Sequence, residues 1–245
     1  MNLKTTFTPA DFEALACTDL SQTTCVVFDI LRATSSMVTA LANGAEAIIP
    51  VATIEDALAT KAKYPAALLC GERDGMRITA AQTGGTEFDL GNSPREYTAE
   101  IVAGKTLITT TTNGTRALRA CANAERVLVA SFLNLTATAE CLRAAVPENL
   151  VLVCSGTYEE AALEDTLAAG ALADALWERC DECDDATQTA RLLFNSAPVE
   201  ETMLQAKNAQ RLLSLPDLAD DVSFCLQLDS QNFTAVMDRN GMILR

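Results

Sequence analysis

The stretch TCVVFDILRATSSMVTALAN, residues 24–43, contains the unit from which the fold is built. Its first part, residues 24–29, is a short apolar run that predicts a strand. The second part, residues 33–43, predicts a helix that stops at Gly44, since glycine commonly follows the last turn. A strand that leads directly into a helix is the repeating unit of α/β proteins.

The same alternation continues along the chain. The residues at 53–63 predict a second helix, in which Thr53 and Asp56 have roughly the spacing of a capping box. Apolar runs of this length between helices are typical of a buried, largely parallel sheet. Further strands are predicted at residues 46–51, 66–71, 105–112, 126–132 and 149–155. We therefore expect an α/β fold with three layers, in which helices flank a largely parallel or mixed sheet. The organisation is either a single domain over residues 1–245 or two closely joined α/β halves.

Two regions interrupt this rhythm. Residues 71–100 are rich in glycine and lack a clear period until Ser93, where the run Ser-Pro-Arg-Glu predicts the start of a helix. A loop of this length in a compact protein is usually functional or disordered. Towards the C-terminus, residues 186–213 read as helical, and Asn240-Gly241 predicts a tight turn.

The composition predicts a soluble, cytoplasmic protein with an aliphatic core. Hydrophobic residues make up 49% of the chain and aromatic residues 5%. No apolar run approaches the ~20 residues that span a bilayer, and the first residues do not resemble a secretory signal. The nine cysteines lie mostly in apolar runs, so we expect free thiols. The pair Cys180 and Cys183 has metal-like spacing but lacks the partners of a zinc site, and we interpret it as incidental.

Charge and missing residue types restrict the function. The net charge of −15 makes nucleic acid an improbable partner, because the phosphate backbone would be repelled. Most of the 18 basic residues are arginines, whose planar guanidinium matches phosphate, carboxylate or sulfonate oxygens. The chain has no histidine, which excludes histidine-based triads and HExxH zinc sites. P-loop and dinucleotide motifs are absent too, so metal-assisted chemistry on an oxyanion remains.

Polar residues gather where the predicted strands end. In open α/β sheets, ligands bind at the carboxyl ends of the strands, where the following helices offer free N–H groups to anions. TTNGTR, residues 111–116, has the features of an anion cradle: Gly114 lets the backbone approach and Arg116 can clamp the ligand. The alternative is an ordinary strand-to-helix turn that uses Asn-Gly for its geometry. The segment alone does not decide between them.

Acidic residues occupy other strand ends. Asp29 ends the first strand, and a buried carboxylate is costly unless it is paired or binds a metal. An Asp29–Arg32 pair or a helix cap is the structural alternative. Glu72, Asp89 and Asp165 supply further oxygen ligands. Hard oxygen ligands together with arginines suit Mg²⁺ and phosphate.

Several motifs in order resemble the 2-phosphosulfolactate phosphatase (ComB-like) family. They span about residues 25–170, with weaker similarity from DVSFCLQLD, residues 221–229, to the C-terminus. The motifs are DILRATSSMVTALANGA at 29–45, CGERDG at 70–75, FDLGNSPREYT at 88–98, GKTLITTTTNGTRAL at 104–118, SFLN at 131–134, and VLVCSGT at 151–157 with LEDTLAAG at 163–170. Their number and order make the resemblance far more specific than any single motif.

The resemblance implies a Mg²⁺-dependent phosphatase with an α/β fold of its own, which hydrolyses (R)-2-phospho-3-sulfolactate to sulfolactate and phosphate. It implies a small anionic phosphorylated substrate and, at family level only, a homodimer. The expected metal ligands are Asp29 and Glu72, with Asp165 or Asp89 as further candidates. Arg32 and Arg116 would grip the phosphate. Asp29 and Ser155 are the candidates for a covalent route, and direct attack by water stays equally open.

The remaining expected substrate contacts come from the same turns. Arg73 or the Ser155-Gly156-Thr157 turn would receive the sulfonate or carboxylate of the substrate. The expected contacts are Arg73, Asn92, Ser93, Thr112, Asn113, Gly114, Thr115, Gly156 and Thr157. Two alternatives remain open: a phosphatase for another small phosphorylated hydroxy acid, and a non-catalytic anion-binding protein. The joint presence of carboxylates and arginines argues against the binding protein, since carboxylates repel a phosphate unless a cation intervenes.

Overall fold

The predicted strands lie in one continuous sheet in the computed structural model, which describes all residues from Met1 to Arg245. Its strands are β1 (Asn2–Thr6), β2 (Thr23–Phe28), β3 (Ala47–Pro50), β4 (Leu68–Arg73), β5 (Met76–Arg77), β6 (Thr106–Thr110), β7 (Arg126–Ala130), β8 (Asn149–Cys154), β9 (Glu182–Cys183), β10 (Ala235–Met237) and β11 (Ile243–Leu244). Their spatial order is β5-β4-β6-β3-β11-β10-β7-β2-β8-β1-β9. The predicted α/β fold with a mixed, mostly parallel sheet is confirmed.

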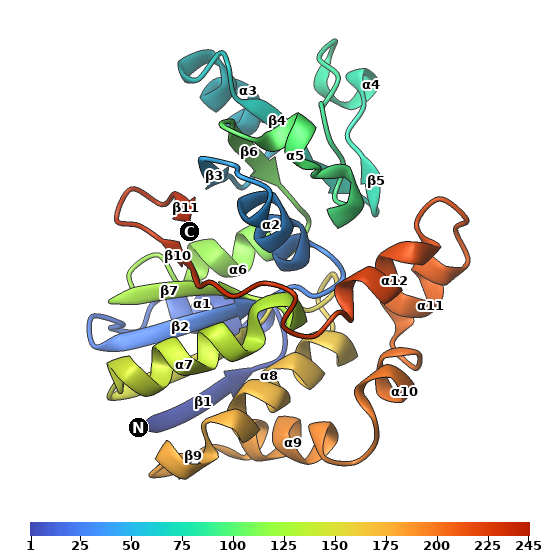
Figure 1. The fold of residues 1–245 in the computed structure, drawn as a ribbon. Helices are drawn as coiled ribbons and strands as arrows, with labels where there is room; N and C mark the ends of the chain where they lie inside the picture. The colour runs from blue at the N-terminus through green and yellow to red at the C-terminus, as the bar shows by residue number, and fades with distance from the viewer.

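A C-terminal hairpin joins two parallel parts of the sheet (Figure 1). Strands β7, β2, β8, β1 and β9 are parallel to one another, and so are β4, β6 and β3. Between them, β10 pairs antiparallel with β7, and β11 pairs antiparallel with β3. The turn predicted at Asn240-Gly241 connects the two hairpin strands, and Gly241 has φ +78°, which suits glycine.

Twelve α-helices accompany the strands, and none is long and apolar enough to span a bilayer. They are α1 (Ala10–Ala16), α2 (Ala33–Ala42), α3 (Ile54–Lys63), α4 (Ala80–Thr83), α5 (Ala99–Val102), α6 (Gly114–Ala120), α7 (Leu135–Ala145), α8 (Leu163–Ala175), α9 (Asp185–Phe194), α10 (Val199–Met203), α11 (Lys207–Leu213) and α12 (Ala219–Cys225). As predicted, Thr53 caps α3 by accepting a hydrogen bond from the backbone N–H of Asp56 at 3.0 Å. The predicted helix α2 ends at Ala42, with Asn43 as its C-cap just before Gly44.

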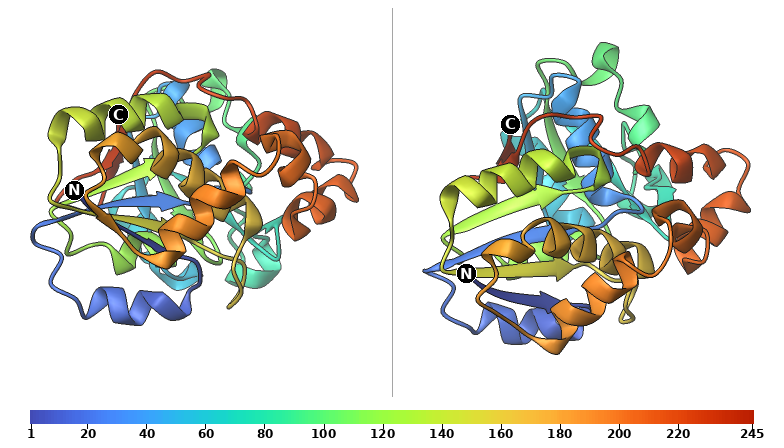
Figure 2. Two further views of the ribbon diagram at one scale, coloured as in Figure 1. Left: turned by 90° about the horizontal axis from the view of Figure 1, so that it is seen from below. Right: turned by 60° about the horizontal axis from the view of Figure 1, so that its bottom comes forward.

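Helices cover both faces of the sheet (Figure 2). Because side chains alternate along a strand, Cys25 and Val27 of β2 enter one core cluster, whereas Val26 and Phe28 enter another. The first cluster includes residues of α1, α2 and α6, and the second includes residues of α7 and α8. A smaller cluster packs α3 against β4 and β6. This gives the three layers that the alternating pattern predicts.

Three details differ from the sequence-based expectation. The helix expected after Ser93 is a single 3₁₀ turn, Pro94–Glu96, and the chain turns again at Tyr97 before α5. The helical stretch expected over residues 186–213 is three helices, α9, α10 and α11, and the segment between the first two contains Pro198. Proline cannot donate to a helix interior, which explains the first break. Strand β1 was not predicted, although it pairs with β8 inside the sheet.

Candidate active site

A pocket of about 650 Å³, its open mouth included, lies at the carboxyl ends of four strands, two from each parallel part of the sheet. Asp29 follows β2 and Glu72 lies near the end of β4. Asn113 follows β6, and Gly156 follows β8. Strands β2 and β8 belong to one parallel part of the sheet and β4 and β6 to the other, so both parts contribute to the pocket. The sequence predicts a ligand at such strand ends. The pairings through β10 and β11 are antiparallel, so the two parts run in opposite directions across the sheet and their carboxyl ends meet at this pocket.

Asp29 presents one free carboxylate oxygen to this pocket. Its Oδ1 accepts a hydrogen bond from the backbone N–H of Ala33 at 3.0 Å, whereas Oδ2 accepts none from the protein. A Cβ placed on Gly114 would lie 2.6 Å from Asp29 Oδ2 and 2.8 Å from the Cβ of Ala33. Glycine is therefore required at position 114 for α6 to begin this close to the carboxylate.

Burial raises the pKa values of three carboxyl groups in the pocket, and for two of them neighbouring carboxylates add to the effect. Burial raises the pKa of Asp29 to about 7, and the negative charges of Glu72 and Glu164 contribute. Burial also raises the pKa of Asp165, with further contributions from Glu164 and Asp29, and burial raises that of Glu164. The pocket thus concentrates negative charge that a bound cation would neutralise.

Two of these carboxylates hold the surrounding loops. Glu72 Oε1 accepts hydrogen bonds from the backbone N–H and the hydroxyl of Thr112, at 2.8 and 2.9 Å, and Oε2 accepts one from the N–H of Gly75 at 2.7 Å. Asp165 accepts from the N–H groups of Ile30 and Gly156, at 2.8 and 3.1 Å. These bonds fix the turns after β2, β4, β6 and β8 relative to one another.

The donor set fits a magnesium ion held by few protein ligands. No three acidic or thiol side chains are close enough together to hold a metal ion as a cage. Mg²⁺ usually keeps several waters and binds through one or two carboxylates and the phosphate of its ligand. Asp29, Glu164 and Asp74 each keep one carboxylate oxygen without a protein donor: their other oxygens accept from Ala33, Asn208 and Tyr158. Asp74 is exposed, so Asp29 and Glu164 are the better enclosed candidates to hold Mg²⁺.

Arg32 lines the pocket but is held from behind. Its side chain is 3% exposed, and its Nη1 donates to Asp221 Oδ2 at 2.6 Å. Its Nη2 donates to the carbonyl oxygen of Gly75 at 2.6 Å. The Asp29–Arg32 ion pair, one of the alternatives from the sequence, does not form. Arg32 pairs with Asp221 of α12 instead.

Other predicted residues lie in the pocket wall or directly behind it. Asn92, Thr112, Asn113, Gly156 and Thr157 line the pocket. Ser93 lies behind it and donates to Asp221 Oδ1 at 2.7 Å, and Thr115 is buried and bonded to Thr111. Ser155 is fully buried, its Oγ has no hydrogen-bond partner, and it does not line the pocket.

Three predicted residues point elsewhere. Arg73 donates to the carbonyl oxygen and the hydroxyl of Thr110, at 3.3 and 3.0 Å. Asp89 is exposed and accepts from the backbone N–H of Leu69 at 2.8 Å. Arg116 forms an ion pair with Glu159 at 2.9 Å and lines a separate surface groove. The structure does not support Arg116 as a phosphate clamp or Asp89 as a metal ligand.

We expect Arg116→Ala to keep kcat/KM within about threefold, or under ~1 kcal/mol of transition-state binding. The reason is that Arg116 is 43% exposed and its guanidinium is bonded to Glu159 outside the pocket. Steady-state kinetics measures this directly. Glu159→Gln, which removes the same ion pair from the other side, serves as the control and should behave alike. A decrease in kcat/KM of more than tenfold in Arg116→Ala, without a similar decrease in Glu159→Gln, would show that Arg116 takes part in the site.

The contribution of α11 to the pocket was not predicted from the sequence. Asn208, Arg211 and Leu212 of this helix line the pocket, together with Asp74 and Tyr158 from neighbouring turns. Asn208 donates to Glu164 Oε1 and to Thr157 Oγ1, both at 2.6 Å. The spacing of Asn208 and Arg211, three residues apart, places both on one helix face. That spacing is the one sequence feature that points to a shared role for the two residues, and it does not indicate which part of the protein the helix face contacts.

Comparisons with known proteins agree with the geometry. The family model described as 2-phosphosulpholactate phosphatase matches residues 11–240. A probable 2-phosphosulfolactate phosphatase of Thermotoga petrophila is 42% identical over 215 residues, which cover 87% of this chain and 88% of that protein. Proteins with the same description from Caldanaerobacter subterraneus and Clostridium acetobutylicum are each 38% identical, over 231 and 210 residues. These alignments cover 92% and 84% of this chain, and 91% and 86% of the relatives.

Proposed function

The chain belongs to the 2-phosphosulpholactate phosphatase family of phosphoric monoester hydrolases, and we propose that it hydrolyses (R)-2-phospho-3-sulfolactate to 3-sulfolactate and phosphate with Mg²⁺. The observation that carries the proposal is the pocket at the strand ends. Asp29 Oδ2 is free there, close to the start of α6 at Gly114. The proposed partner is a small anionic metabolite.

The charges of the pocket support the metal requirement. Asp29, Glu72, Asp74, Glu164 and Asp165 line it. Only two arginines line the same pocket. The proposed substrate carries a phosphate, a carboxylate and a sulfonate, and carboxylates repel such an anion in a poorly solvated pocket. A bound Mg²⁺ neutralises phosphoryl charge and polarises the phosphoryl oxygens.

The chain's own residues position the phosphoryl group. Asn113 anchors the turn before α6, because its Nδ2 donates to the carbonyl oxygens of Ser155 and Tyr158, both at 3.0 Å. This holds Gly114 beside Asp29. Asp29 is a better candidate than Ser155 for direct contact with the phosphoryl group, since the Oγ of Ser155 is buried outside the pocket lining. Water attack and a phosphoenzyme are both compatible with this arrangement.

We expect phosphate release from racemic phosphosulfolactate to need Mg²⁺. Removal of divalent metal with EDTA should lower the rate at least about tenfold, which corresponds to ~1.4 kcal/mol, and excess Mg²⁺ should restore it. The physical reason is the unneutralised carboxylate cluster around Asp29. A colorimetric phosphate assay measures the rate. Phospholactate, which lacks the sulfonate, is the matched substrate.

The two substrates separate the proposal from its alternatives. Faster metal-dependent release from phosphosulfolactate than from phospholactate supports the proposal. Metal-dependent release from phospholactate alone would mean that the protein is a phosphatase of the same mechanism with a different substrate. Release that is indifferent to EDTA overturns the metal requirement. Binding of either compound without any turnover favours an anion-binding protein.

A further inference from the structure

Arg211 places a guanidinium group in the pocket that has no carboxylate partner. It lies on α11 and lines the pocket, and its Nη2 donates to the backbone carbonyl oxygen of Asp74. It forms no ion pair within 4.0 Å. Arg32, the other arginine of the pocket, is neutralised by Asp221. Arg211 is therefore the pocket cation whose charge is still available to a ligand.

The two guanidinium groups meet above one turn. A Cβ built on Gly75 would lie 3.7 Å from Nη2 of Arg211 and 3.9 Å from Nη2 of Arg32. Both arginines also donate to carbonyl oxygens of this turn, those of Asp74 and Gly75. The charge of Arg32 is balanced by Asp221, so the uncompensated positive charge here is that of Arg211. Both guanidinium groups still gather donors on one side of an otherwise acidic pocket.

Helix α11 holds this side of the pocket rigidly. Asn208, one turn before Arg211, donates to Thr157 Oγ1 and Glu164 Oε1, both at 2.6 Å. Leu212, next to Arg211, is buried and lines the pocket. The helix is thereby tied to the turn after β8 and to α8, so Arg211 is positioned before a ligand arrives. Such preorganisation reduces the entropy lost on binding.

We propose that Arg211 binds the sulfonate of the substrate and so determines specificity. This inference rests on the proposed function. The phosphoryl group belongs with Asp29 and the metal, and Arg211 contacts a different turn, that after β4. The sulfonate stands one carbon further from the phosphate-bearing carbon than the carboxylate does, which suits the exposed Arg211. Guanidinium is weakly hydrated and presents a planar fork of donors to an oxyanion. Arg73, the earlier candidate for this role, is bonded to Thr110 instead.

The test pairs two substitutions on one helix with two substrates. Arg211→Gln should lower kcat/KM for phosphosulfolactate by about tenfold to a hundredfold, the range for losing a hydrogen bond to a charged group. For phospholactate, the change should stay within about threefold. Lys207→Gln is the control, because Lys207 lies on α11, is 88% exposed, and pairs with Glu160 outside the pocket. It removes the same charge and should change neither value.

Every outcome bears on the inference. Equal losses on both substrates would show that Arg211 binds a group common to them and overturn the assignment to the sulfonate, as would no loss on either. If the wild-type protein turns over neither substrate, the proposed function fails and calorimetry still tests Arg211. Binding of 3-sulfolactate that weakens in Arg211→Gln, with lactate as the reference, then supports the inference. Equal binding by both proteins, or no binding by the wild type, overturns it.

Discussion

Asp29→Asn should lower kcat/KM by at least about a thousandfold, the scale found for removing a group that acts on the transition state. The substitution keeps an oxygen that can accept from the N–H of Ala33, so the start of α2 is retained. It also removes the negative charge and places the amide NH2 group where the free Oδ2 lies beside Gly114. Either role of Asp29, metal ligand or direct phosphoryl contact, requires that charge. Steady-state phosphate release with saturating Mg²⁺ measures the loss.

The same variant should be as stable as the wild-type protein or more stable. The pKa of Asp29 is raised from 3.8 to about 7 in the folded protein, so the folded state binds the proton more tightly than the unfolded state. The stability contributed by this group is therefore complete below pH ~4 and is lost as the pH rises through 7. Asparagine does not titrate and avoids this loss. Thermal unfolding in EDTA at pH 8 checks the expectation and separates lost chemistry from lost fold.

Asp89→Asn provides the matched control. Asp89 was predicted as a metal ligand from the same sequence reasoning, yet it is exposed and accepts only the N–H of Leu69. The same chemical change should leave kcat/KM within about threefold. If Asp29→Asn kept more than a tenth of the activity, the carboxylate cluster at the strand ends would not be the reaction centre. The pocket would then bind the substrate by a different group.

The sheet and its ligand-binding edge could be predicted because both follow from local patterns. Strand β2 is a continuous apolar run, and Asp29 follows it directly. The carboxyl ends of neighbouring parallel strands share one edge, which brings Asp29 close to Gly156 and Glu72 close to Asn113. The sequence pattern does not show that these two pairs meet in one pocket, because the antiparallel pairings of β10 and β11 make the two parts of the sheet run in opposite directions. No pattern in the sequence gives the direction of β10 and β11, which pair with strands far away along the chain.

The errors among the site residues follow from the direction of side chains. Glu72 and Arg73 are neighbours on β4, and successive side chains of a strand point to opposite faces. Since Glu72 enters the pocket, Arg73 turns away from it. Gly114 and Arg116 are two residues apart on α6, or about 200° around a helix of 3.6 residues per turn. With Gly114 against Asp29, Arg116 must face the opposite side.

The contribution of α11 depends on a contact that sequence spacing cannot supply. Arg211 lies more than a hundred residues from Glu72, and it reaches the Asp74-Gly75 turn because α11 is tied to Thr157 and Glu164 and packs beside α12, which is anchored by a buried carboxylate. Asp221 makes that anchor. It is fully buried and accepts hydrogen bonds from Arg32 at 2.6 Å, Ser93 at 2.7 Å and Arg95 at 2.8 Å. One carboxylate thus connects the turn after β2 and the Ser93–Arg95 segment to α12.

Asp221→Ala should therefore lower the free energy of unfolding by about 3–5 kcal/mol, the cost of removing one partner of a buried ion pair. The substitution leaves the guanidinium of Arg32, 3% exposed, without its countercharge, and it leaves the hydroxyl of Ser93 without an acceptor. Urea denaturation measures the change, with the midpoint and slope fitted together. Residual activity should fall as well, because Arg32 loses the contact that positions it in the pocket wall.

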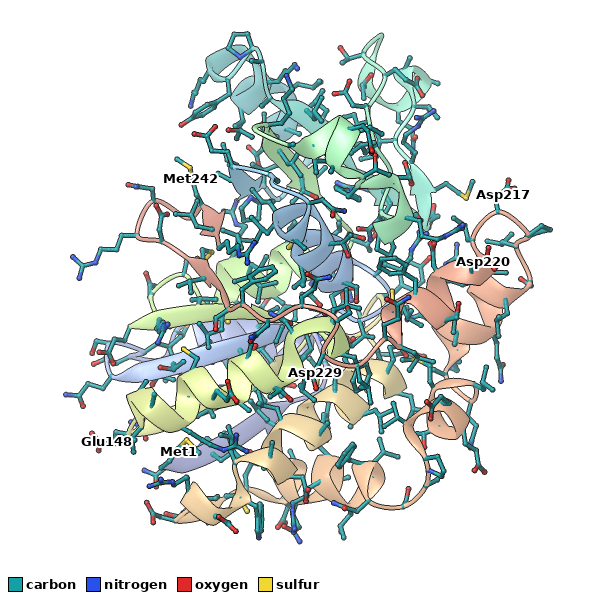
Figure 3. All side chains as sticks on the ribbon, in the orientation of Figure 1. Met1, Glu148, Asp217, Asp220, Asp229 and Met242 are labelled. Atoms are coloured by element: carbon teal, nitrogen blue, oxygen red, sulfur yellow. The ribbon has the colours of Figure 1, made fainter.

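Asp220→Ala is the matched control for Asp221→Ala. Asp220 is the adjacent residue on α12, and Figure 3 shows it on the outer side of the C-terminal helices. It is 78% exposed and reaches Arg95 only at 3.5 Å, so its removal should cost less than about 1 kcal/mol. The two variants lose the same charge from the same helix and differ only in burial and partners. Equal effects would mean that Arg32 finds water when Asp221 is removed, and that α12 does not depend on this ion pair. A much larger loss of stability in Asp221→Ala than in Asp220→Ala would show that the single buried carboxylate of Asp221 holds α12 behind the pocket.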